Sequence, residues 1–174
     1  MTEFISTYGL AIVFAAVALE SLGVPVPGES SLIAAGVLAS RGDFHVGALI
    51  GVATAAAIVG DNAGYVIGRW GGRELLERWG PLRRFAPRVL PRAERFFARY
   101  GGGAVFLARF VPGVRVAAAW MAGLSRMDWR RFLAWNAIGA VVWATAVVLA
   151  GDVLSEAASQ AVAIAMTALR RHLP

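Results

Sequence analysis

Val26-Pro27-Gly28-Glu29-Ser30 and Val111-Pro112-Gly113-Val114-Arg115 are two matching interruptions in an otherwise apolar chain. Each places a Val-Pro-Gly break inside hydrophobic sequence, with charged residues beside it and a run of small residues after it. Helix breakers and charges are costly at membrane depth, so they usually mark functional sites. Their recurrence about 85 residues apart indicates two related half-units, and paired broken segments are typical of transporter sites.

The composition is that of an integral membrane protein. The 174 residues are 58% hydrophobic with a mean hydropathy of +0.62, whereas soluble domains are roughly 45–50% apolar. The net charge of +6 is compatible with a nucleic-acid partner, but the arginines cluster in loops, as the positive-inside rule predicts, so we expect no nucleic acid. The absence of cysteine excludes disulfides and thiolate metal sites. The two histidines, His45 and His172, lie far apart in the sequence, so we expect no metal and no cofactor.

The distribution of charge predicts the topology. The segment 69–99 is dense in arginine, so we expect it on the cytoplasmic side, together with Arg126–Arg131 and the C-terminal Arg170-Arg171. Because both ends of the segment 100–125 are then cytoplasmic, the chain must return to the side that it left. We therefore expect a re-entrant helical hairpin here, broken at Pro112-Gly113.

The same reasoning gives residues 4–43 a hairpin that enters from the opposite side and breaks at Pro25-Val26-Pro27-Gly28. A transmembrane helix is expected after each hairpin, over 44–68 and over 132–151. A hairpin plus a span, repeated with the opposite sense, is an inverted repeat. Phe4–Leu19 is also compatible with a complete span, which would place the N-terminus inside, but we favour the hairpin.

The expected fold is an all-α integral membrane protein with one membrane domain over 1–174. It consists of a first repeat (4–69), a cytoplasmic amphipathic linker (70–99), a second repeat (100–151) and an additional C-terminal transmembrane helix (152–174). The linker mixes arginine with leucine, tryptophan and phenylalanine, which is typical of amphipathic helices on an anionic leaflet. Glycines at a four-residue spacing in the first span predict close helix packing. They are Gly60, Gly64, Gly68 and Gly72, with Gly47 and Gly51 upstream.

Charged side chains also occur within or beside apolar sequence. A charge near the bilayer centre costs about 2.5–3.5 kcal/mol on insertion scales, so each needs a physical reason to be there. Structural pairing of opposite charges is one explanation, but we favour a single cavity lined by both hairpin tips. The charged residues are Glu20, Glu29, Asp61, Arg109 and Arg115, and the tips are expected at Pro25, Pro27, Gly28, Pro112 and Gly113.

The arginines flank the second break. Each guanidinium offers a planar fork of donors that fits a phosphate group, and the free N–H groups after Gly113 add positive potential. We therefore assign phosphate binding to Arg109, Arg115 and Gly113. A carboxyl group in a low-dielectric site can exchange a proton near neutral pH.

On that ground we assign proton coupling or gating to the acidic residues Glu20, Glu29 and Asp61. Phosphate-binding arginines that face titratable carboxylates indicate proton-coupled transport of an anionic headgroup.

Three motifs follow one another along the chain. They are Glu20 with Pro25-Val26-Pro27-Gly28-Glu29, then Gly60-Asp61-Asn62-Ala63-Gly64-Tyr65-Val66-Ile67-Gly68-Arg69, then Phe106-Leu107-Ala108-Arg109-Phe110-Val111-Pro112-Gly113-Val114-Arg115 with Ala122-Gly123. Together they resemble the DedA family of membrane proteins, also called the SNARE-associated or VTT-domain family, over roughly residues 8–150. The chain departs from many members at Val116 and Ala119, where those have Thr and Pro.

The resemblance implies a lipid transporter in the bacterial cytoplasmic (inner) membrane. Bacterial members are associated with the return of undecaprenyl phosphate to the cytoplasmic leaflet. Others are associated with phosphatidylethanolamine handling or envelope homeostasis, with dependence on the proton motive force. Mapped by motif, the family's essential acidic residues fall on Glu20, Glu29 and Asp61, and its essential arginines on Arg109 and Arg115.

The leading hypothesis is a flippase for a polyprenyl phosphate, with lipid and protons as its partners and a homo-oligomer left open. Alternatives in the same class are a phospholipid scramblase and a proton-coupled small-ion transporter. A lipid phosphatase is a third reading, but the chain has no cysteine nucleophile, no paired histidines in apolar sequence and no clustered aspartates. We therefore do not expect an enzyme. A structural scaffold for envelope assembly is a fourth reading.

Overall fold

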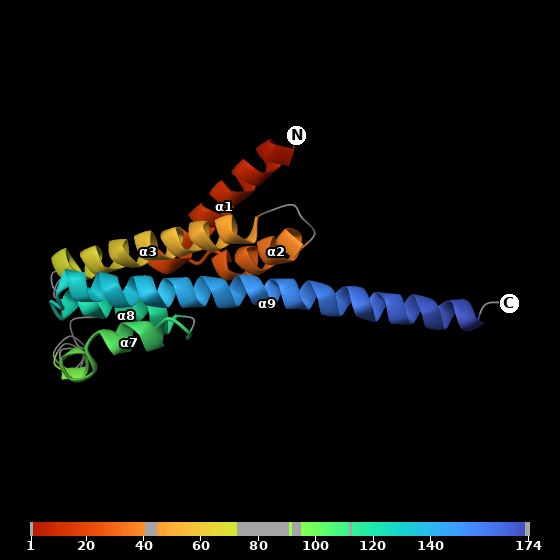
Figure 1. Ribbon diagram of the computed structural model, residues 1–174. Coiled ribbons are helices and arrows are strands. Elements are labelled where there is room, and N and C mark those ends of the chain that lie inside the picture. Colours follow the sequence, from red (N-terminus) through yellow and green to blue (C-terminus); the bar gives the residue numbers. More distant parts are fainter. Residues whose placement is uncertain (1, 41–44, 73–90, 92–94, 112, 173–174) are drawn as a thin grey trace.

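The computed structural model describes residues 2–40, 45–72, 91, 95–111 and 113–172, and within these ranges the regular structure is entirely helical. This confirms the all-α prediction. Residues 95–100 form a short helix that leads into α7. The other helices, in chain order, are α1 (Thr2–Leu22), α2 (Gly28–Ser40), α3 (Val46–Trp70), α7 (Gly102–Ala108), α8 (Val114–Leu124) and α9 (Trp129–His172) (Figure 1).

The first break separates α1 from α2. Gly23 ends α1 with a φ of 113°, a conformation that glycine adopts without steric cost. Residues 24–27 have no regular secondary structure, and Pro25 and Pro27 cannot donate a backbone hydrogen bond. The α2 helix then begins at Gly28, and Ser31 N donates to Pro27 O at 3.0 Å. The predicted break is therefore present, and it produces a helical hairpin.

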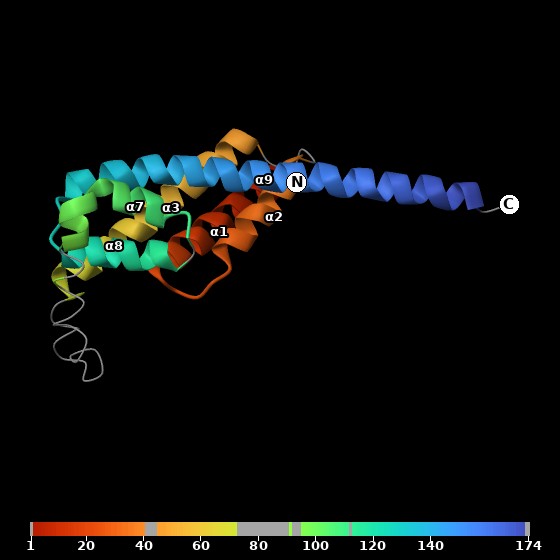
Figure 2. The ribbon, with the colours of Figure 1, turned by 90° about the horizontal axis from the view of Figure 1, so that it is seen from below.

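The second break separates α7 from α8. Gly113 has a φ of 77° and precedes the first residue of α8, whereas Pro112 lies outside the described residues. The hairpins α1–α2 and α7–α8 approach from opposite ends of the bundle, and their turns lie side by side near its middle (Figures 1 and 2). Trp120 Nε1 of α8 donates to Leu22 O at the end of α1, at 3.1 Å. The two predicted hairpin tips are therefore neighbours.

Two helices are long and apolar enough to cross a membrane, judged by length and composition among the described residues. They are Val46–Trp70, which is α3, and Trp129–Ala157, the first part of α9. The two lie alongside each other (Figure 1). These helices match the spans expected over 44–68 and 132–151.

The predicted division at residue 152 is wrong. The α9 helix runs without interruption from Trp129 to His172, a length of about 66 Å at 1.5 Å per residue. Asp152 and Glu156 lower the hydropathy, but a charge does not stop a helix, and this alanine-rich stretch contains no proline. The end of α9 therefore lies far from the end of α3 and from its own beginning (Figure 1). The side of the membrane on which the C-terminus lies stays a prediction.

The predicted amphipathic linker, 70–99, lies mostly outside the described residues. Its last residues, 95–100, form the short helix already described, and the amphipathic character of the whole segment stays a prediction. Phe97 is 8% exposed while Phe96 is 48% exposed.

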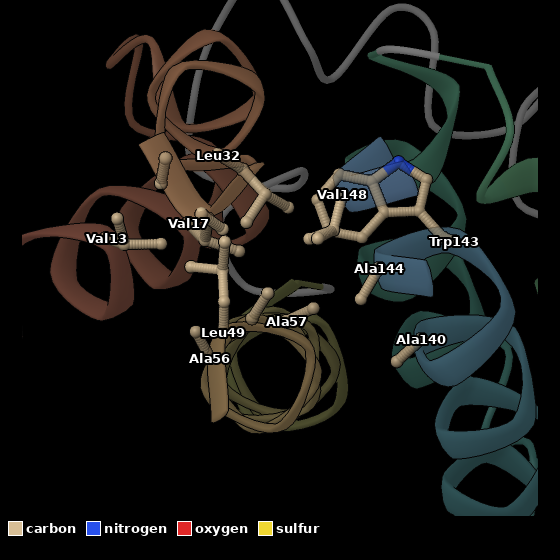
Figure 3. Close-up of a cluster of buried hydrophobic side chains, with 13 residues drawn as sticks. Val13, Val17, Leu32, Leu49, Ala56, Ala57, Ala140, Trp143, Ala144 and Val148 are labelled. Carbon is tan, nitrogen blue, oxygen red and sulfur yellow. The ribbon is translucent and has the colours of Figure 1, made fainter. Parts of the chain in front are cut away.

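A buried apolar cluster holds α1, α2, α3 and α9 together (Figure 3). Val17, Leu32 and Leu49 project from the first three helices toward Val148 and Trp143 of α9 (Figure 3). In a bilayer the lipid tails are as apolar as these side chains, so the hydrophobic effect does not favour helix association. The stabilisation comes from tight van der Waals packing.

Glycines on α3 make that packing possible, as the spacing predicted. An added Cβ on Gly60 would overlap the Ala18 carbonyl oxygen of α1, and one on Gly68 would overlap the Trp120 carbonyl oxygen of α8. An added Cβ on Gly64 would lie 2.9 Å from Cδ1 of the Trp120 ring. By contrast, Gly47 and Gly51 have no neighbour within 4 Å of an added Cβ, so the upstream glycines take no part in the ridge.

We predict that Gly68→Ala destabilises the protein, whereas Gly47→Ala in the same helix does not. Overpacking costs about 1–3 kcal/mol, which exceeds the gain of about 1 kcal/mol in helix propensity that both substitutions share. Thermal unfolding of the detergent-solubilised variants measures the difference. Equal stability of the two variants would contradict the close contact between α3 and α8.

Candidate functional site at the meeting hairpin tips

Arg109 forms a buried polar contact that joins three helices. Its Nη2 donates to Asp61 Oδ2 on α3 and to Asn136 Oδ1 on α9. The exposed fractions of Asp61, Arg109 and Asn136 are 1%, 2% and 1%. Gly139 leaves room for the arginine stem, because a Cβ there would lie 3.2 Å from Arg109 Cδ. The end of α7 is thus fixed against both long helices.

Arg115 forms the second ion pair, with Glu20 of the opposite hairpin. Its Nη2 lies 3.3 Å from Glu20 Oε1. The guanidinium also lies over the Trp143 ring of α9, 5.0 Å from its centroid. The Glu20 side chain is 22% exposed and that of Arg115 is 6% exposed, so this pair is longer and more open to its surroundings than the Arg109 pair.

Glu20 also closes its own hairpin. Its Oε2 accepts a hydrogen bond from the Glu29 backbone N–H at 2.6 Å, in the first turn of α2. The carboxylate can come this close because Gly28 has no side chain, and an added Cβ would overlap Glu20 Oε2. Glu20 therefore connects the start of α2 to the start of α8, which is the point where the two hairpins meet.

The two ion pairs form one charged cluster at the hairpin tips, since Arg109 and Arg115 flank the second break and Glu20 lies at the end of α1 beside the first. Several of its buried atoms have no hydrogen-bond partner among the described residues: Asp61 Oδ1, Arg109 Nη1, Arg115 Nε and Asn136 Nδ2. Buried polar groups are usually paired, so these three donor atoms, against a single acceptor atom, need an explanation. An anionic group or ordered water can satisfy these donors.

The structure brings together four of the five charged residues that the sequence singled out: Glu20, Asp61, Arg109 and Arg115. The fifth, Glu29, joins through its backbone N–H, and its half-buried carboxylate has no ion pair within the described ranges. The tip residues Pro25, Pro27 and Gly113 are exposed, whereas Gly28 is buried, and Pro112 is not described.

Sequence reasoning missed Asn136, Trp120 and Trp143, because it considered charges and helix breakers only. Asn136 did leave a signal, since it is a strongly polar residue inside the apolar run 132–151. The tryptophans left none, because their roles depend on which helix they face. Within the described ranges, no three His, Cys, Asp or Glu side chains gather in a metal-binding arrangement.

Comparisons with known proteins confirm the family that the sequence motifs indicated. A family model for the VTT domain matches residues 26–153. An uncharacterized membrane protein of Synechocystis sp. is 42% identical over 144 residues, which are 83% of this chain and 66% of that protein. The chain thus spans just under two thirds of that relative's length.

Two relatives carry more informative names. The protein DedA of Escherichia coli is 37% identical over 160 residues, which are 87% of this chain and 72% of that protein. Undecaprenyl phosphate transporter A of Staphylococcus aureus is 34% identical over 160 residues, which are 90% of this chain and 79% of that protein. No solved structure matches the chain.

We predict that Asp61→Asn alone and Arg109→Met alone each destabilise the protein more than the double variant does. Either single change leaves an uncompensated buried group, and breaking a buried pair costs about 3–5 kcal/mol. The double variant removes both charges and should recover most of that loss. Unfolding of the four proteins in detergent gives the coupling energy.

Glu29→Gln serves as the control, because this carboxylate has no ion pair among the described residues, and it should leave stability almost unchanged. A double variant whose loss equals the sum of the single losses would mean that Asp61 and Arg109 do not act as a pair.

Proposed function

Because the chain belongs to the DedA family of VTT-domain membrane proteins, we propose that it is a flippase that moves a polyprenyl phosphate between membrane leaflets. The observation that carries this proposal is the cluster of two buried, incompletely hydrogen-bonded arginines where the hairpin tips meet. The name of the Staphylococcus aureus relative supports undecaprenyl phosphate as the substrate. The lipid tail stays in the bilayer, so only the headgroup needs a polar site.

The lengths of α2 and α8 support a re-entrant arrangement. With 13 and 11 residues, α2 and α8 measure about 20 Å and 17 Å, while the hydrocarbon core of a bilayer is about 30 Å thick. Helices of this length can reach the middle of the membrane but are too short to cross it. In this proposal α1–α2–α3 and α7–α8–α9 are the two halves of an inverted repeat, and the tips meet near the bilayer midplane.

In this proposal the Arg69 end of α3 faces the cytoplasm, and the arginine-rich sequence that follows it supports this orientation. The start of α9 lies at the same end of the bundle (Figure 1).

The two arginines take different roles in this mechanism. Arg109 is held by Asp61 and Asn136 and provides a fixed positive charge. Arg115 has the longer ion pair and an unpartnered Nε, so it makes the first contact with the arriving phosphate. The phosphate then competes with Glu20 for the guanidinium. Protonation of Glu20 weakens its hold on Arg115, and this exchange couples proton entry to headgroup binding.

We expect Arg115→Gln to reduce transport of polyprenyl phosphate at least about tenfold, because a hydrogen bond to a charged group contributes about 1.5–3 kcal/mol. Arg130→Gln, at an exposed arginine in the first turn of α9, should leave transport unchanged. The assay follows a fluorescent polyprenyl phosphate in proteoliposomes. Wild-type flux of phosphatidylethanolamine at the same rate would replace the proposal with a broad-specificity scramblase. Unaltered flux in Arg115→Gln would refute the phosphate contact.

Proton coupling has its own test. An imposed proton gradient should accelerate transport by the wild-type protein, and Glu20→Gln should remove this dependence because the glutamine cannot titrate. Glu156→Gln is the control, since that exposed carboxylate on α9 is not among the residues assigned to the site, and it should keep the response. Gradient dependence that survives Glu20→Gln would assign the coupling to another residue.

A further inference from the structure

An apolar groove follows the length of the α7–α8 hairpin on the face away from the arginines. Its volume is about 790 Å³, within the range of about 300–1,000 Å³ that is usual for ligand pockets. At the tip it is bounded by Ala108 and Val114, and at the base by Gly103 and Met121. Small side chains along both helices leave it hollow, and its lining atoms are almost entirely apolar.

The two faces of this hairpin have opposite chemistry. Arg115 and Ala119 of α8 are buried in the bundle, while Val114, Ala117 and Ala118 line the groove. On α7, Ala108 lines the groove and the next residue is Arg109. On both helices the residue that bounds the groove at its tip is therefore adjacent in sequence to an arginine.

The other end of the groove has the character of a membrane interface. The short helix 95–100 contributes Phe96, Phe97 and Tyr100 to the lining, and the Arg99 guanidinium lies over the Tyr100 ring at 5.6 Å. Aromatic rings beside a cation are typical of the boundary between hydrocarbon and headgroups. The hairpin lies alongside α3 and α9 (Figures 1 and 2), so the groove follows the direction that lipid chains take in a bilayer.

We propose that this groove binds the hydrocarbon tail of the lipid whose phosphate is held at the hairpin tips. This inference rests on the proposed function. An apolar hollow exposed to a bilayer fills with hydrocarbon, because empty space forfeits van der Waals contacts. Tail chemistry alone does not favour one lipid over another there. Binding of the phosphate by Arg115 does favour one lipid, because it keeps the tail of the same molecule at a high effective concentration beside the groove.

Gly103 gives a direct test, because a Cβ added there meets nothing within 4 Å. Gly103→Phe should fill the groove without disturbing the fold. Gly51→Phe is the matched control, since Gly51 is equally open and lies on α3, away from the groove. The probe is a polyprenyl phosphate with a photoreactive group in its tail, crosslinked in proteoliposomes and mapped by peptide mass spectrometry.

We expect crosslinks on the peptide with Ala117 and Met121, reduced at least about tenfold by Gly103→Phe and by Arg115→Gln but not by Gly51→Phe. Transport of the long-tailed substrate should fall with Gly103→Phe, while a short-tailed analogue should be affected less than about twofold. Equal loss for both substrates, or labelling that Gly103→Phe leaves intact, would overturn the tail site.

Two further outcomes separate this inference from the proposed function. A phosphatidylethanolamine probe that labels the groove as strongly as polyprenyl phosphate, irrespective of Arg115, would overturn the inference in favour of a resident lipid. Wild-type protein that transports no polyprenyl phosphate, yet shows labelling dependent on both Gly103 and Arg115, would refute the flippase and leave the tail site standing.

Discussion

The contact of Arg109 with Asp61 and Asn136 imposes the constraint on which the arrangement of the bundle depends. A guanidinium that is 2% exposed cannot remain uncompensated, because removal of a charge from water costs several kcal/mol unless a partner of opposite charge and further hydrogen bonds replace the solvent. The partners come from α3 and α9, so α7 must end at the level where those two helices present them. The position of the second hairpin along the bundle is therefore fixed. At this position Arg115 lies at the level of Glu20 and can pair with it. The position of one charge thus determines where the two hairpins meet.

Close helix packing makes that constraint achievable. Ion pairs between helices need backbones near enough for side chains to reach across, and α3 provides this through glycines that contact α1 and α8. The same device recurs between α2 and α9, where an added Cβ on Gly36 would lie 2.8 Å from Val148 O and one on Gly151 would lie 2.7 Å from Ile33 O. In a membrane these contacts supply the association energy that the hydrophobic effect cannot. Small residues and buried charges therefore act together. The small residues let the helices approach closely, and the buried charges fix the register between them.

The chemistry of the two faces of α7–α8 links this architecture to the proposed transport. One face presents fixed positive charge to the opposing tip. The other presents the apolar groove, which leads toward the aromatic rings and Arg99 of the short helix 95–100. An amphipathic lipid with a phosphate head and a long tail has the same division of chemistry. The ion pair of Arg115 with the partly exposed Glu20 is the weaker of the two contacts, which suits a group that must exchange partners. The Arg109 pair is shielded and joins three helices, which suits a group that must stay in place.

The sequence by itself determined the helical membrane class, the two breaks, the glycine ridge and the identity of the charges that gather at the site. These features are local: proline and glycine interrupt helices wherever they occur, and a charge in apolar sequence is conspicuous without any structure. Only the tertiary structure decided that Asp61 pairs with Arg109 while Glu20 pairs with Arg115, since these partners are 48 and 95 residues apart in the chain. It also decided the role of Asn136 and the continuity of α9 through residue 152. Each of these depends on which helix faces which at a given depth, and that is determined by packing between distant segments rather than by the residues adjacent in sequence.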